Sequence, residues 1–188
     1  DGEMRRLAVF IEAGDYVLVE IGEVPLQTCL RFISLVKERR ALVVLDVDLD
    51  PVFQCRGKSA EVASLFSVAD ILMPNRLSLS SLYPDRTPEE LVMTLWTDFG
   101  KSAIVSAAED GVYYNIGSEV SHQRIFETQV VDTVGAGDAL HGGVVFALSA
   151  GMSLPEAVKL GARCGAMACS AAGARAGMPR APALGLAV

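Results

Sequence analysis

The sequence has no apolar run of the roughly 20 residues that a membrane-spanning helix needs, and it has no excess of basic side chains. Its 16 Lys and Arg residues are outnumbered by 23 Asp and Glu, which gives a formal net charge of −7. This balance argues against unspecific binding to nucleic acid or to anionic membranes. The opening residues, DGEMRR, contain no signal-peptide core. We therefore expect a cytoplasmic protein with neither a nucleic-acid nor a membrane partner.

Cysteine and histidine are both scarce. The four cysteines, at positions 29, 55, 164 and 169, do not have the spacing of a metal site, and His122 and His141 stand alone. We expect the thiols to be reduced and buried, and the histidines to be structural.

The chain is long and rich in apolar residues. At 188 residues with 51% hydrophobic side chains, it is long enough to bury a core. We expect a single α/β domain over residues 1–188.

Short apolar runs alternate with segments of helical spacing. This alternation predicts a mostly parallel sheet flanked by helices, with one β-hairpin near its edge. The opening residues read as a charged turn. The predicted strands are 16–21, 41–47, 70–73, 102–107 and 112–116, with an extended segment at 122–131, and the predicted helices are 27–40, 58–69, 88–99, 136–150 and 154–172.

Polar groups are expected where several of these strands end. Asp46, Asn75, Ser106 and the turn at Gly135 all lie at predicted strand ends. Ligands of parallel sheets bind outside the carboxyl ends of the strands, so these groups could face one crevice. Asp46 opens an alternating acidic run with Asp48 and Asp50, for which we favour a solvated loop over a metal site.

A glycine-rich turn at 132–138 leads into the predicted helix at 136–150. Gly135 and Gly137 allow a ligand to approach the backbone, and the first amides of a helix lack intrahelical acceptors. Asp138 lies in the first turn of that helix. Its carboxylate could take a proton from an attacking hydroxyl, or it could simply compensate the helix dipole.

The residues D-T-V-G-A-G-D-A at 132–139 resemble the second signature of the ribokinase (PfkB) family of carbohydrate kinases. The resemblance implies that the amides of Gly135, Ala136 and Gly137 form an anion hole and that Asp138 is the catalytic base. A dinucleotide-binding turn fits less well, because Leu140 stands where its third glycine would fall. The resemblance also implies a monovalent cation such as K⁺ at Asp132 and the carbonyl of Val134.

Asn75 resembles the first residue of the family's N-x-x-E element, which helps to organise magnesium and phosphate. Ser78 stands in the acidic position of that element. A hydroxyl can bind a water molecule but brings no negative charge to a divalent cation. The alternative for Asn75 is a helix N-cap, and both interpretations remain open.

The segment from Ser106 to Gly111 resembles the family's T-L-G-x-x-G element beside the nucleotide. Ser106 and Gly111 match that element, whereas Ala108 replaces a glycine. The same residues would also make an ordinary hairpin turn.

The helix that contains Ala162 and Gly165 resembles the family's small-residue helix at the adenine pocket. Close packing between helices explains its composition equally well.

The resemblance covers residues 16–182 and implies a ribokinase-like three-layer sandwich with helices on both faces. It also implies that an N-terminal part of about a hundred residues, with the lid and most sugar-binding residues, lies outside this sequence. The implied reaction transfers the γ-phosphoryl group of ATP, with Mg²⁺, to a hydroxyl of a small sugar or sugar acid, and the full-length form would be a homodimer. The alternative is a catalytically impaired nucleotide- or phosphate-binding relative, or an inactive fragment.

Overall fold

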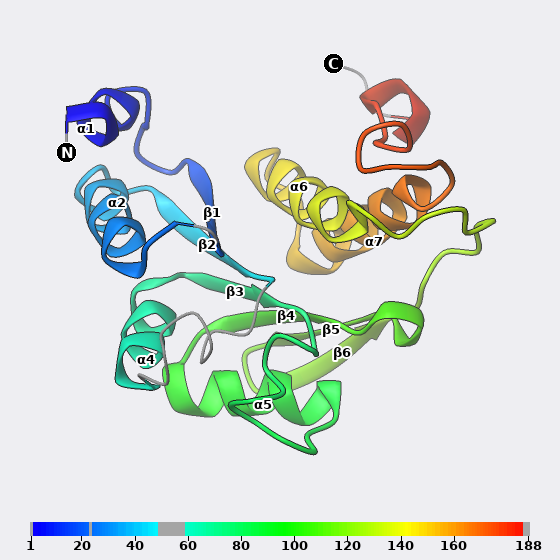
Figure 1. Ribbon diagram of the computed structural model, residues 1–188, viewed down its shortest axis with the longest axis horizontal. Helices are drawn as coiled ribbons and strands as arrows, with labels where there is room; N and C mark the ends of the chain where they lie inside the picture. Colours follow the sequence, from blue (N-terminus) through cyan, green and yellow to red (C-terminus); the bar gives the residue numbers. More distant parts are fainter. Residues whose placement is uncertain (1, 23, 49–58, 186–188) are drawn as a thin grey trace. The chain divides into compact units, whose positions relative to one another are not determined.

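The computed structural model describes residues 2–22, 24–48 and 59–185 (Figure 1). The chain divides into two compact units. The first contains residues 1–107 and 113–122, and the second contains residues 108–112 and 123–188. Each unit is described by itself below. The single domain expected from the sequence stays a prediction.

The first unit is built on a six-stranded sheet whose spatial order, β1-β2-β3-β4-β5-β6, is the order of the chain. The first four strands are parallel. Links of five residues between β4 and β5, and of two residues between β5 and β6, are too short for a parallel crossover, so these pairs are antiparallel. The strands are β1 Tyr16–Ile21, β2 Leu42–Val47, β3 Ile71–Pro74, β4 Ser102–Ser106, β5 Val112–Ile116 and β6 Glu119–Gln123.

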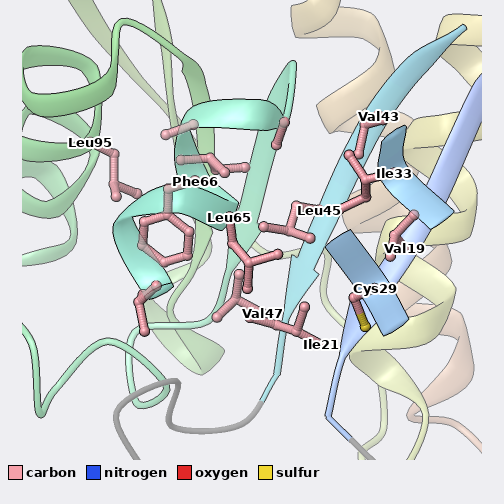
Figure 2. Close-up of a cluster of buried hydrophobic side chains, with 14 of the residues drawn as sticks. Val19, Ile21, Cys29, Ile33, Val43, Leu45, Val47, Leu65, Phe66 and Leu95 are labelled. Atoms are coloured by element: carbon pink, nitrogen blue, oxygen red, sulfur yellow. The ribbon is translucent and has the colours of Figure 1, made fainter. Parts of the chain in front are cut away.

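The core of this unit lies between one face of the sheet and three helices, α2 Leu26–Glu38, α4 Ser59–Val68 and α5 Pro88–Phe99. Alternate strand residues such as Val43, Leu45 and Val47 are fully buried on this face (Figure 2). Ile33 of α2 and Leu65 of α4 belong to the same cluster. Burial of each large aliphatic side chain stabilises the fold by about 1.5–3 kcal/mol.

The second unit is an antiparallel pair of helices, α6 Ala136–Ser149 and α7 Leu154–Ala168, followed by a short 3₁₀ helix at Ala181–Leu184. Glycine lets the two helices approach closely. A Cβ atom at Gly161 would lie 2.6 Å from the carbonyl oxygen of Leu140, and one at Gly143 would lie 2.8 Å from Cys164 Sγ. These glycines therefore set the spacing of the pair.

Three segments differ from the sequence expectation by more than a shift of one or two residues at an end. The opening residues form a helix, α1 Gly2–Ala8, because Glu, Met, Arg, Leu and Ala all favour helix. The extended segment expected at 122–131 is a strand only to Gln123, and its strand begins earlier, at Glu119, where the hairpin turn ends. The last helix ends at Ala168, short of residue 172.

Across the described ranges, no helix has both the length and the apolar character that crossing a membrane requires.

Candidate functional site

The glycine turn of the second unit delivers the chain into α6 with open donors at its start. Gly135 is the N-cap residue and has a φ of 82°, in the left-handed region that glycine favours. The amide of Ala136 donates to Thr133 O at 3.2 Å, and the first helical bond runs from Ala139 N to Gly135 O at 2.9 Å. Among the described residues, the amides of Gly135, Gly137 and Asp138 have no backbone acceptor. Three of the four first-turn donors therefore remain available to an anion.

Asp138 lies in the first turn of α6 with its side chain exposed. It borders a cavity of about 260 Å³ between α6, α7 and the segment that follows α7. The other lining residues are mostly apolar, and Phe146, Leu160, Met178 and Leu184 are among them. A carboxylate here is within reach of a ligand and is not turned into the core.

Asp132 is the first residue of the turn, and both of its carboxylate oxygens accept hydrogen bonds. Oδ1 accepts the amide of Val134 at 3.0 Å, and Oδ2 accepts the amide of Gly173 at 2.8 Å. These two bonds, the Val134 one first, lower the pKa of the Asp132 carboxyl below its usual range. The carboxylate thus joins the turn to the segment that follows α7.

Two further contacts tie these segments together. The amides of Val131 and Asp132 both approach Cys169 O, at 2.8 and 3.3 Å. A Cβ atom at Gly135 would lie 2.9 Å from Ala174 O. The sequence did not reveal Cys169, Gly173 or Ala174 as neighbours of the turn, because the contacts depend on how the chain returns after α7.

Asn75 and Ser78 belong to the first unit, just beyond the end of β3. Asn75 Oδ1 accepts the Ser78 amide at 2.8 Å, across the turn that follows β3. Its Nδ2 donates to Asp48 Oδ1 at 2.8 Å. Ser78 is 2% exposed, and its hydroxyl lies 2.6 Å from Val47 O and 2.7 Å from Asn75 O. Residues 76–82 form turns and the next helix begins at Pro88, so Asn75 caps a turn and the helix N-cap expected as its alternative is wrong. The Ser78 hydroxyl is committed to backbone carbonyls.

Ser106 lies beside Asn75 in the same unit, where the two residues form an isolated parallel bridge. Ser106 O also accepts the amide of Arg76 at 2.8 Å. The carboxyl ends of β3 and β4 thus bring together two of the residues expected at one edge of the sheet.

The turn after Ser106 is a 3₁₀ helix, Ala108–Asp110, followed by Gly111. Gly111 has a φ of 92°, as its glycine identity suggests, but Ala108 also has a positive φ, of 47°. Ala108 therefore adopts the left-handed conformation that the glycine of the family element would adopt without strain.

Ala162 and Gly165 lie on α7 and are both buried. A Cβ atom at Gly165 would lie 3.1 Å from Ala136 O, so this glycine allows α7 to pack against the first turn of α6. Close helix packing, the alternative weighed for this segment, is thus present at Gly165.

Asp46 does not lie in a solvated loop, and that expectation is wrong. It is 5% exposed and lies within β2, paired with Glu20 on one side and Met73 on the other. The strand continues to Val47, which places Asp46 inside the sheet. Asp50 lies outside the described residues.

Within the described ranges there is no cluster of three or more His, Cys, Asp or Glu residues that could hold a metal ion. The predicted site residues fall in two groups. Asn75 and Ser106 lie together in the first unit; Asp132, Gly135–Asp138 and Gly165 lie together in the second, which also contains Gly111 and Ala162.

Comparison of the sequence with models of known protein families gives a match that includes the signature at 132–139. The model of the pfkB family of carbohydrate kinases matches residues 8–181, a span that includes the glycine turn, Asp138 and both helices of the second unit. The chain belongs to this family.

Known members resemble the chain over most of its length. Fructokinase-1 of Zea mays is 28% identical over 187 residues, covering 94% of this chain and 57% of its own. The crystal structure of ribokinase from Thermotoga maritima matches with a TM-score of 0.76 at 27% identity, covering 91% of this chain and 55% of that one.

Aminoimidazole riboside kinase from Salmonella enterica, solved with aminoimidazole riboside and an ATP analogue, matches with a TM-score of 0.79 at 25% identity. That match covers 93% of this chain and 63% of the other. The ribokinase-like α/β fold expected from the signature is confirmed by these structures. The chain spans about half the length of the curated relatives that it matches.

Proposed function

We propose that this chain is the nucleotide-binding portion of an ATP-dependent sugar kinase, which transfers the γ-phosphoryl group of ATP to a hydroxyl of a small sugar or sugar acid. The observation that carries the proposal is the turn itself. Amides without acceptors and an exposed carboxylate stand together at the start of α6. Family membership, and relatives that are named as sugar kinases, support the same reaction class.

In the proposed reaction, the acceptor hydroxyl attacks the γ-phosphorus and gives its proton to Asp138. A bond forms between the hydroxyl oxygen and phosphorus, while the bond to the bridging β–γ oxygen breaks and ADP leaves with the electron pair. The amides of Gly135 and Gly137 stabilise the charge on the moving phosphoryl oxygens. Ala136 is proposed as a third donor. Its amide already donates to Thr133 O, so it contributes less than the other two amides to stabilising this charge.

Asn75 and Ser106 in the first unit, and Gly111, Ala162 and Gly165 in the second, stay predicted nucleotide contacts, each within its own unit. Phosphate oxygens suit the glycine turn, because its open amides are hydrogen-bond donors without a partner. We infer that Mg²⁺ is held chiefly by the phosphates, since Ser78 is committed to backbone carbonyls and the described residues contain no metal-binding cluster.

A monovalent cation such as K⁺ is proposed at Asp132 and the Val134 carbonyl. Both are hard oxygen donors, and each carboxylate oxygen keeps a lone pair beside its amide bond. The cation would share these oxygens with the amides.

The second candidate is a relative that binds nucleotide but has lost the transfer step. The buried Ser78 in the acidic position favours it, because no carboxylate there can balance a divalent cation. Homodimerisation of the full-length form stays a prediction.

Calorimetric titration of the protein with ATP, with and without magnesium, followed by an ADP-release assay over a panel of sugars, separates these functions. Binding together with sugar-dependent ADP release supports the kinase. Binding without release for any sugar supports the impaired relative, and the absence of binding contradicts both.

A further inference from the structure

Asp132 is the first residue of the glycine turn, and its side chain contacts both the turn and the segment that follows α7. Its carboxylate accepts one amide from within the turn, that of Val134, and one from beyond α7, that of Gly173. The two bonded residues are far apart in the sequence, so this side chain joins the turn to a distant segment, as the amide bonds to Cys169 O also do.

Apart from the carboxylate bonds, the turn is tied to the segment after α7 by the amides of Val131 and Asp132, which approach Cys169 O. Gly135 and Gly137 leave its backbone conformationally free, and no side chain caps α6. Its own internal bonds are the Ala136 amide to Thr133 O and the Ala139 amide to Gly135 O. A hydrogen bond to a charged acceptor is stronger than a neutral one, so the two carboxylate bonds are the strongest contacts that the turn makes.

The backbone of the turn also packs closely against the segment that follows α7. Gly135 approaches Ala174 so tightly that a Cβ atom would lie 2.9 Å from Ala174 O. Ala174 follows Gly173 directly, so the carboxylate bond and the backbone approach act on the same pair of segments. The carboxylate bond that holds Gly173 in place therefore also holds Ala174 against Gly135.

We propose that Asp132 is a positioning residue, whose carboxylate fastens the glycine turn to the segment after α7 and thereby holds the first amides of α6 in the orientation that receives phosphate. Its effect on ligand binding rests on the proposed function. Its effect on the turn does not.

The test compares amide hydrogen exchange in the wild-type chain with Asp132→Asn and Asp132→Ala. Asparagine keeps one acceptor oxygen, so it can hold one of the two amides, whereas alanine holds neither. Exchange at Val134 and Gly173 reports the bonds themselves, and exchange at Ala136 and Ala139 reports the turn. We expect exchange at Ala136 and Ala139 to rise about tenfold or more in Asp132→Ala, with Asp132→Asn between it and wild type.

Asp85→Asn is the matched control, because it removes the same charge from an exposed site in the other unit. It should leave exchange at all four reporter amides unchanged. If exchange rises at Val134 and Gly173 but not at Ala136 and Ala139, Asp132 is a local contact only and the proposal is overturned.

A second readout is the affinity for ADP, measured by calorimetry. We expect Asp132→Ala to weaken ADP binding at least about tenfold while the urea midpoint of unfolding of the first unit stays the same. If exchange at Ala136 rises while the ADP affinity stays unchanged, the proposal that Asp132 orients these amides for phosphate binding is overturned. A wild-type chain that binds no ADP contradicts the proposed function, and the exchange experiment still decides whether Asp132 holds the turn.

Discussion

Gly161 and Leu140 approach so closely that a Cβ atom on Gly161 would lie 2.6 Å from the Leu140 carbonyl oxygen. Gly161→Ala should therefore force α6 and α7 apart and lower the free energy of unfolding by about 1–3 kcal/mol. Urea unfolding measures this loss. Gly142→Ala is the matched control, because a Cβ atom there meets nothing within 4 Å and alanine favours helix. Equal stability of the two variants would contradict the close packing.

The glycine turn gives a second pair of variants. Gly135→Ala places a side chain at a φ of 82° and within 2.9 Å of Ala174 O, whereas Gly137→Ala meets no atom within 4 Å. We expect Gly135→Ala to weaken ADP binding strongly and to destabilise the second unit, and Gly137→Ala to have the smaller effect on stability. Calorimetry and thermal unfolding of both variants test this, and a Gly135→Ala variant that unfolds at the wild-type temperature would be the contrary result.

Ala108 carries strain that a glycine would relieve. With a φ of 47°, its side chain costs about 1–2 kcal/mol relative to an unstrained conformation, although glycine also gains freedom in the unfolded chain. Ala108→Gly should raise the free energy of unfolding by up to about 1 kcal/mol. Ala150→Gly is the control, because Ala150 has a φ of −81° and gains nothing. A loss of stability in Ala108→Gly would show that its conformation is not strained.

The capping box at the start of α7 predicts a pH dependence. Hydrogen bonds from Ser153, its hydroxyl first and its amide second, lower the pKa of Glu156 in the folded protein. Because the folded pKa is the lower one, this stabilisation is complete above the ordinary glutamate pKa of about 4.3 and is lost as the pH falls through the folded pKa.

Glu156→Gln should consequently reduce the drop in melting temperature between pH 6 and pH 3. Glu89→Gln, which removes a carboxylate from the first turn of α5 and leaves the capping box there intact, is the control. If the melting temperatures of Glu156→Gln and wild type change identically with pH, the capping bonds of Glu156 do not contribute to the pH dependence of stability.

Asp138→Asn tests the proposed base directly. In the protein that carries this chain, we expect turnover to fall about 10²–10⁴-fold, the range for the loss of a general base, with little change in nucleotide affinity. Sugar-dependent ADP release measures turnover, and Asp85→Asn controls for the charge. Near-full turnover in Asp138→Asn would remove this residue from the mechanism and leave it as a dipole-compensating acid.

Much of the fold could be predicted because local signals and tertiary structure agree. Helix α5 begins and ends where the sequence indicates, since Thr87 and Glu90 form a capping box, Pro88 occupies the first turn and Gly100 ends the helix in the left-handed conformation. The four parallel strands, β1 to β4, lie within two residues of their expected bounds, because continuous apolar runs are typical of buried parallel strands.

The site was less predictable because its contacts join distant segments. The sequence marks Asp132 as part of a signature but gives no sign that Gly173 shares its carboxylate. It also leaves open whether Ser78 faces solvent, which depends on the carbonyl of Val47, at the end of β2, lying beside its hydroxyl. Neither contact follows from the composition of one segment.

The agreement between strand order and chain order has a consequence for how the first unit assembles. Among the six described strands, each strand from β2 to β6 pairs with the strand that precedes it in the chain, so it has a partner as soon as it is synthesised. Sequence separations between partners stay small, which favours rapid folding. We expect β2 to β6 to join the sheet in the order in which the ribosome makes them.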